Sequence, residues 1–577
     1  MKRVFKELFK FKKELILIII TVIGTTLCTL GLPALLSIMI NDAILNGSNS
    51  KVLEVGGLMI ILALLSVLCG MVTSHSSAIV SMGVGRNLRR QIFEKVQYFS
   101  QTEFDKFSSS SLITRTNNDI TQIQNFLNQC LRIAIQAPIM CIGGICLALI
   151  KSPALSSVLI ISMPIMIIII TIIGKMAVPL SKSIQTKIDK INLIMREKLT
   201  GVRVIRAFGT TDFETKKFNN VNLDYKKNNM KLQRTTNSIT PALVLILSLT
   251  SAGIMLIAYN GHLNGATYQI GDVMAIIQYV LLIMLSVMML TIIFILLPRA
   301  STAAKRANEV LNTECIIKNT DSPKYNEDQK GYLEFRNVTF AYPNADVPAI
   351  KNISFSAKPG ETTAIIGGTG AGKSTIVNLI PRLYDTTNGE IIVDGINAKD
   401  YDIQTLRSKI GFVPQKSILF SGTIESNIQF GDKNADEDRM EQAVKIAQSY
   451  DFIMKKEQGF NSPISQGGGN VSGGQRQRLA IARAIVRKPE IYVFDDSFSA
   501  LDFKTDKSLR TALADETEQA TVIIVAQRVS TIMEADRIIV IDKGEAVGIG
   551  THEELLNNCE VYKEIVSSQM SEEEMKK

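Results

Sequence analysis

The sequence predicts an α-helical domain that crosses a membrane six times, followed by an α/β domain. Three observations predict this class. The 577-residue chain is 46% hydrophobic and has a mean hydropathy above zero, which is apolar for a soluble protein of this size. Its first three hundred residues contain long apolar stretches, and beyond Gly331 short β-branched runs alternate with helical patterns. The composition excludes disorder, collagen-like repeats and a small disulfide scaffold.

The membrane domain is predicted from six apolar stretches, most of them near or above the ~20 residues that a helix needs to cross hydrocarbon. The first stretch is too long for a signal peptide and no small-residue cleavage site follows it, so we expect it to remain as the first span. The stretches are Leu15–Ile40, Gly56–Val80, Ile133–Ile150, Leu155–Val178, Ile239–Tyr259 and Val273–Leu297.

Lys and Arg predict the orientation, because cytoplasmic connections near the ends of spans carry the excess of positive charge. The N-terminal segment and the connections after the second and fourth spans are basic, whereas the other connections offer only Lys51 and Lys151. Both termini are therefore predicted to be cytoplasmic, in a multi-pass protein of a bacterial cell membrane. The formal charge of +9 then belongs beside the lipid bilayer, and we expect no nucleic acid as a partner.

The two basic connections run for about forty-five and about sixty residues with helical periodicity and little Pro or Gly, which predicts helices that extend into the cytoplasm. Each contains a short amphipathic segment where the chain could turn and contact another domain. We place these segments around Phe99–Ser109 and around Arg206–Phe218, because their Phe side chains would otherwise be exposed.

A polar, turn-rich segment, Asn319–Lys330, is typical of a linker. We therefore place the membrane domain at residues 1–311, the linker at 312–330 and the second domain at 331–577. In the second domain, the alternation of strand and helix patterns predicts a largely parallel central sheet.

The first motif of this domain is GGTGAGKST at Gly367–Thr375, which matches G-x-x-x-x-G-K-[ST] between an apolar strand and a helical run. Glycines let the backbone approach phosphates, and the helix N-terminus adds positive potential. Lys373 is expected to reach the β- and γ-phosphates, and Ser374 to offer Mg²⁺ an oxygen. The domain is therefore predicted to bind a nucleoside triphosphate. The predicted binding residues of the loop are Thr369, Gly370, Ala371, Gly372, Lys373, Ser374 and Thr375.

The second motif is the buried strand IYVFDD, Ile491–Asp496, which ends in two carboxylates. Asp495 is placed to hold Mg²⁺ directly or through water. Buried strands often end in acidic residues, so this motif gains its weight from the phosphate loop beside it.

The third motif, VSGGQRQ at Val471–Gln477, resembles the signature loop of the ATP-binding-cassette (ABC) superfamily. The resemblance extends over nearly the whole chain. Tyr342 resembles the aromatic residue that stacks on adenine, Gln415 the Q-loop residue at the metal and catalytic site, and Asp502 belongs to a D-loop-like SALD. The six spans and the stretch EKLTGVRVIRAFG at Glu197–Gly209 resemble the exporter branch, in which the turns of the intracellular helices press on the nucleotide-binding domains.

The resemblance implies an ABC half-transporter that must dimerise, because in this family each ATP lies between the phosphate loop of one cassette and the signature of the other. ATP would close the cassettes and hydrolysis would separate them. The resemblance implies that Ser472, Gly473 and Gly474 of this chain bind the partner's nucleotide. The residues implied to bind nucleotide through the signature and the D-loop are Ser472, Gly473, Gly474, Gln475 and Asp502.

Two positions depart from the family pattern in the same site. Asp496 stands where the family has a Glu general base, and its carboxylate would fall roughly 1–1.5 Å short of the attacking water, which can cost about a hundredfold in rate. Gln527 stands where the family has a switch His, and an amide cannot carry the imidazolium charge. We therefore predict slow hydrolysis at this chain's own site and a different partner subunit, whose catalytic site the intact signature completes.

The expected function is that of one subunit of a heterodimeric, multidrug-type exporter of hydrophobic or amphipathic compounds (drugs, lipids or peptides), driven by ATP with Mg²⁺. Three alternatives stay open. The chain could form a homodimer, since Asp can act as a base where geometry lets it. It could import, or it could be a membrane regulator or sensor with slow ATP turnover. The sequence does not predict the substrate.

Overall fold

The computed structural model describes residues 1–569 except 46, 264–267, 327 and 344. It divides into two compact units, which are described separately. The first comprises Met1–Gln97 and Ser109–Asn312, and the second comprises Tyr98–Ser108 together with the chain from Thr313 onward.

The first unit is helical. Among the residues that the structure describes, six helical segments are long and apolar enough to cross a membrane, and each contains one of the predicted stretches. The predicted membrane domain is therefore confirmed. Several segments exceed the length of a bilayer span, as expected for helices that continue beyond it. They are Lys12–Ile44, Asn49–Gln97, Ser109–Lys151, Pro153–Thr200, Thr211–Leu263 and Ile270–Asn312.

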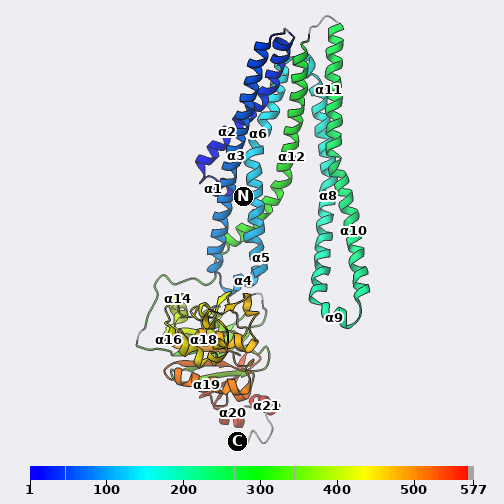
Figure 1. Ribbon diagram of the computed structural model, residues 1–577. Helices are drawn as coiled ribbons and strands as arrows, with labels where there is room; N and C mark the ends of the chain where they lie inside the picture. The colour runs from blue at the N-terminus through cyan, green and yellow to red at the C-terminus, as the bar shows by residue number, and fades with distance from the viewer. Residues whose placement is uncertain (46, 264–267, 327, 344, 570–577) are drawn as a thin grey trace. The chain divides into compact units, whose positions relative to one another are not determined.

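Four long helices lie side by side, with α12 along α6 and α2 along α3 (Figure 1). Their bounds are α2 Lys12–Ile38, α3 Asn49–Gln97, α6 Ile120–Lys151 and α12 Ile270–Asn312, and a short helix α1, Lys2–Leu8, precedes them. A π-helical turn, Met39–Ile44, extends α2.

A polar network joins α2, α6 and α12 at one end of this group. The Lys151 Nζ donates to Asp272 Oδ1 and to Ser37 Oγ, both at 2.9 Å. A Cβ on Gly271 would lie 2.5 Å from the Ser37 carbonyl oxygen, so only glycine permits this close approach of α12 to α2. Because Ser37 is fully buried, the network fixes where the three helices meet.

The helices α8, Val158–Thr200, and α10, Thr211–Asn237, form an antiparallel arm that ends at the short helix α9, Val202–Ala207 (Figure 1). The helices α9 and α10, which the structure describes in full, contain no buried residue. Phe208 and Phe213 beside the tip are 77% and 67% exposed. The arm therefore presents apolar side chains that the described residues leave exposed.

The turn at the tip of this arm lies inside the predicted segment. We expected a contact segment around Arg206–Phe218, and the chain turns there between the end of α9 and the start of α10 at Thr211. Gly209, with φ of +63°, ends the α9 turn, and the acidic Asp212 and Glu214 favour a new helix start directly after it.

The other contact segment contains helix α4, Gln101–Phe107, which a capping box of Ser100 and Glu103 begins. The Phe99 ring stacks on Phe107 at 6.0 Å between ring centroids. This segment groups with the second compact unit, separate from the helices on either side of it in the chain. The remaining helices of the first unit are α5 Ser109–Thr114, α7 Pro153–Ser156 and α11 Ile239–Leu263.

The second unit contains a six-stranded sheet with the order β12-β11-β3-β10-β9-β6. All neighbours pair in parallel except β11 and β12, which confirms the predicted, largely parallel sheet. The strands β9 and β10 are buried along their whole length, which explains their continuous apolar sequences. The strands are β3 Thr362–Gly367, β6 Ile410–Val413, β9 Ile491–Asp495, β10 Thr521–Val525, β11 Arg537–Asp542 and β12 Glu545–Gly550.

A second sheet, with the order β2-β1-β4-β5, is antiparallel and was not predicted. The Phe335 and Phe355 rings on β1 and β2 stack at 4.6 Å between centroids. The pairing of β1 with β4 joins residues 49 to 60 positions apart, which no local pattern indicates. The strands are β1 Leu333–Phe340, β2 Ile350–Ala357, β4 Asn388–Val393 and β5 Ile396–Asn397; a small pair, β7 Gly422–Thr423 and β8 Pro463–Ile464, lies apart.

Helices pack around these sheets, and two of them begin at the predicted motifs. The helix α13 follows the phosphate loop and α18 follows the signature. The helices are α13 Lys373–Leu379, α14 Ile403–Ser408, α15 Ile424–Ile428, α16 Glu437–Ile446, α17 Tyr450–Met454, α18 Gly473–Ile485, α19 Phe503–Glu516, α20 His552–Asn558 and α21 Glu560–Gln569.

Candidate nucleotide-binding site

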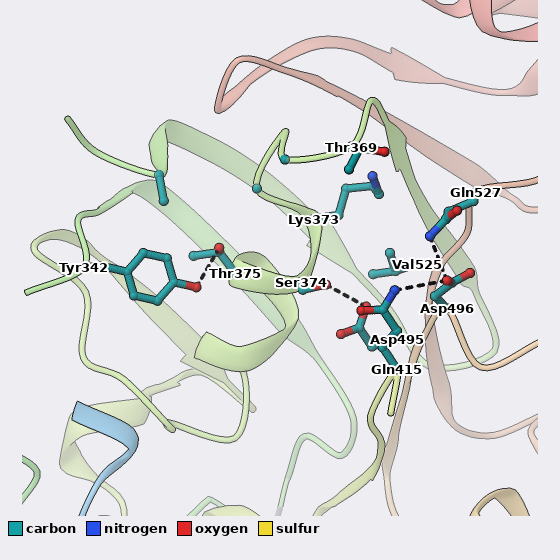
Figure 2. Close-up of a pocket in the computed structure, with 13 residues that line it drawn as sticks. Tyr342, Thr369, Lys373, Ser374, Thr375, Gln415, Asp495, Asp496, Val525 and Gln527 are labelled. Atoms are coloured by element: carbon teal, nitrogen blue, oxygen red, sulfur yellow. Dashed lines mark hydrogen bonds between the residues drawn. The ribbon is translucent and has the colours of Figure 1, made fainter. Parts of the chain in front are cut away.

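Three parallel strands, β3, β10 and β9, end at the same edge of the six-stranded sheet. The loops that follow them surround a cavity of about 370 Å³ (Figure 2). The predicted residues that line this cavity are Tyr342, Thr369, Gly370, Gly372, Lys373, Ser374, Thr375, Gln415, Asp495, Asp496 and Gln527.

The phosphate loop connects β3 to α13. At Gly372, φ is +102° and a Cβ would lie 2.7 Å from Ile350 Cγ2, so this position requires glycine. At Gly368 and Gly370, a Cβ would meet nothing within 4 Å, so the loop backbone faces open space. Ala371 is buried beneath the loop and does not line the cavity. The loop thus offers backbone N–H groups to an anion of phosphate size.

Lys373 curls over the phosphate loop. Its Nζ donates to the carbonyl oxygens of Gly367 and Gly368, both at 2.8 Å. Burial lowers the pKa of Lys373, and the nearby carboxylates of Asp496 and Asp495 oppose that shift. A phosphate in the cavity would give this desolvated ammonium group a full counter-charge.

The Ser374 Oγ donates to Asp495 Oδ1 at 3.0 Å inside the cavity (Figure 2). Burial raises the pKa of Asp495, the hydrogen bond from Ser374 lowers it, and the charge of Asp496 raises it further. Hydroxyl and carboxylate oxygens are the ligands that Mg²⁺ prefers, and a cation would compensate the buried charge. These residues therefore fit Mg²⁺, which would keep positions for phosphate oxygens and water.

Asp496 directly follows Asp495 at the end of β9, and its backbone adopts the left-handed conformation with φ of +50°. Its Oδ2 accepts hydrogen bonds from Gln527 Nε2 at 2.8 Å and from Gln415 Nε2 at 3.3 Å (Figure 2). The backbone is fixed as well, because Asp496 N donates to the Val525 carbonyl oxygen at 3.0 Å. The three predicted catalytic positions are therefore brought together.

Tyr342 forms the opposite wall of the cavity. Its hydroxyl lies 3.0 Å from Thr375 Oγ1, and its ring packs edge-on against Phe340 and Tyr384 at centroid distances of 5.0 and 5.4 Å. The ring is half-buried. It can stack on a flat heterocycle, as the sequence predicts.

The signature residues lie outside this cavity. Ser472 caps α18, because Gln475 N donates to its Oγ at 3.2 Å and its own N donates to Gln475 Oε1 at 3.1 Å. Ser472 and Gly473 are exposed, and Gly474 is only partly buried. Asp502 is also exposed and caps α19.

Three contributors to the site were missed by the sequence analysis. Ala349 and Val525 line the cavity but carry no chemical signal. Gln477, buried on α18, donates to the Asp496 carbonyl oxygen at 3.3 Å and accepts from Ala500 N at 3.3 Å. The sequence places Gln477 in the signature motif, but it does not indicate the contact of Gln477 with Asp496, the residue after β9.

Comparisons with known proteins agree with this geometry. Residues 15–287 match the family model of the ABC transporter transmembrane region, and residues 350–499 match that of the ABC transporter. The uncharacterized ABC transporter ATP-binding protein Rv1273c of Mycobacterium tuberculosis is 40% identical over 550 residues, 94% of each chain. The ATP-dependent lipid A-core flippase of Haemophilus influenzae is 32% identical over 573 residues, 99% of this chain and 97% of its own. A solved structure of a bacterial Atm1-family ABC exporter with ATP bound has a TM-score of 0.80 at 24% identity and covers 97% of this chain and 99% of its own.

Among the described residues, six apolar helices are followed by an α/β domain with a phosphate loop, which is the arrangement of a half-transporter. The chain belongs to the ABC transporter family and has the fold of an ABC exporter half-transporter. Its second domain is the ATP-binding domain of that family.

Proposed function

We propose that this chain is one subunit of an ATP-driven exporter that moves hydrophobic or amphipathic compounds across a bacterial plasma membrane by alternating access. Family membership and the similarity to a lipid A-core flippase, whose named cargo is an amphipathic lipid, support the proposal. The basic connections support cytoplasmic termini. The proposed domains are the membrane domain, 1–311, the linker, 312–330, and the ATP-binding domain, 331–577.

In this proposal the chain's own residues hold MgATP. Lys373 and the loop N–H groups bind the β- and γ-phosphates, and Tyr342 stacks on the adenine. Ser374, Asp495 and Gln415 hold Mg²⁺, which neutralises phosphate charge. The signature residue Ser472 caps the nucleotide of a partner.

The observation that carries the proposal is the hydrogen-bonding of Asp496. The carboxylate at the general-base position is one methylene shorter than Glu, and its Oδ2 already accepts from Gln527 and Gln415. A base occupied by two amide donors is a weaker acceptor for the proton of a water. The site therefore binds ATP as a clamp and hydrolyses it slowly.

Two exposed surfaces of the chain support a dimer. The signature lies outside the chain's own cavity, and the tip of the α8–α10 arm exposes Phe208 and Phe213. A homodimer would have Asp496 and Gln527 in both of its ATP sites, so both sites would hydrolyse ATP slowly. We therefore propose a heterodimer, in which the second subunit supplies a Glu base and a switch His.

The test is to purify the chain without other half-transporters and to measure ATP binding and turnover separately. Tight ATP binding with a turnover far below about 1 s⁻¹, the low end of ordinary enzyme rates, is expected. Turnover at ordinary rates from the isolated chain would instead show an active homodimer. Vesicle transport with the partner present then separates an exporter from a sensor, because a sensor moves no substrate.

A further inference from the structure

One side-chain contact between helix α4 and the rest of the second unit leads to the nucleotide cavity. The Tyr384 hydroxyl donates to Asp105 Oδ2 on α4 at 3.2 Å. Tyr384 is 7% exposed, and burial together with the charge of Asp105 raises the pKa of its hydroxyl above the ordinary value. The hydroxyl therefore stays protonated and acts as a donor to the carboxylate.

On its other side, the Tyr384 ring contacts the aromatic wall of the cavity. It packs edge-on against Tyr342 at 5.4 Å and at an angle of 88° between the rings. Phe340 contacts both rings, at 5.3 Å from Tyr384 and 5.0 Å from Tyr342, so the three rings form a closed triangle. Phe340 and Tyr384 are buried and Tyr342 is half-buried, so the close packing of the three rings couples their movements.

Helix α4 has a second anchor in this unit. Glu103, which is 2% exposed, accepts a hydrogen bond of 3.1 Å from Ile316 N. That anchor is on the segment that follows α12. Tyr384 joins α4 to Tyr342, the residue proposed to stack on adenine.

We propose that Tyr384 is a positioning residue that transmits adenine binding at Tyr342 to helix α4 through Asp105. Adenine stacking fixes the Tyr342 ring, the triangle then fixes Tyr384, and the hydrogen bond holds α4. Since α4 connects α3 to α5 in the chain, its order is passed to two helices of the membrane unit. This inference rests on the proposed function, because it requires adenine at Tyr342.

The experiment compares Tyr384→Phe and Asp105→Ala with the wild type as full-length protein in lipid nanodiscs. Tyr401→Phe is the matched control, because Tyr401 is fully buried in the same core and its hydroxyl donates to the Val393 carbonyl oxygen at 3.1 Å, away from α4. ATP affinity is measured first, and then hydrogen–deuterium exchange of the α4 amides with and without MgATP.

ATP is expected to slow exchange in α4 of the wild type and of Tyr401→Phe. Tyr384→Phe and Asp105→Ala should each lose at least about half of that slowing while ATP affinity stays within about twofold, and the double variant should lose no more than either single one. Full slowing in Tyr384→Phe, equal loss in Tyr401→Phe, or no slowing in a wild type that binds ATP would overturn the inference. A wild type that binds no ATP would overturn the proposed function itself.

Discussion

The side-chain amide of Gln527 donates a 2.8 Å hydrogen bond to the Oδ2 of Asp496. Two departures from the family pattern that lie thirty-one positions apart in the sequence are therefore one interaction in space. A His at 527 and a Glu at 496 would differ from this pair in both charge and reach. The two substitutions have to be tested together, since residues in contact are coupled.

Replacing both residues, Asp496→Glu with Gln527→His, is expected to raise ATP turnover at this site by at least about tenfold. The longer carboxylate reaches the water and the imidazole can carry charge beside the γ-phosphate. Single-site turnover measures the effect, and each single substitution should recover less than the pair. Asp542→Glu, at the end of β11, is the control for an added methylene elsewhere. Unchanged turnover in the pair would contradict the proposed slow site.

Ser374→Ala is expected to weaken Mg²⁺-dependent ATP binding by about tenfold, because it removes the hydroxyl that faces Asp495 in the cavity. Binding of ATP in the presence of a chelator should hardly change. Titration of ATP with and without Mg²⁺ provides the measurement. Ser408→Ala, which removes an exposed hydroxyl on α14, is the control. Equal weakening under both conditions would argue against a metal role for Ser374.

Lys409→Met is expected to cost about 3 kcal/mol of stability, because it leaves a buried charge unpaired. Lys409 Nζ lies 2.8 Å from Asp394 Oδ2 and 2.7 Å from Glu490 Oε2, and the Asp394 side chain is fully buried. The midpoint of thermal unfolding is the readout. Lys351→Met removes an exposed pair with Glu545 and should cost less than about 0.5 kcal/mol. Similar losses in the two variants would refute this prediction.

The stability of the protein is expected to depend on pH through His552. Burial lowers the pKa of this imidazole from 6.5, and its Nδ1 lies 2.7 Å from the Tyr562 hydroxyl. The unfolded chain therefore takes up a proton at a higher pH than the folded one. The contribution is present above pH 6.5 and is lost as the pH falls through the lowered folded pKa.

Thermal unfolding at about pH 7.5 and about pH 5.5 tests this sign. The wild type should lose more stability on acidification than His552→Gln, whose amide can still bond to Tyr562. A variant that loses as much as the wild type would show that other groups carry the dependence.

The sequence predicted those features that local patterns encode. Apolar runs predicted the spans. The phosphate-loop motif predicted a glycine at 372, where the backbone has a positive φ and no room for a Cβ. Features that depend on distant contacts were missed. The bond between Tyr384 and Asp105 joins residues 279 positions apart, and the partners of β1 follow from tertiary packing.

The exposed tip of the α8–α10 arm bears on how long an unassembled copy persists in the cell. Newly made copies that have not assembled with a partner expose Phe208 and Phe213, and chaperones and proteases act on such apolar surface. In the proposed heterodimer the partner would cover this surface, and the abundance of this subunit would then follow the supply of the partner.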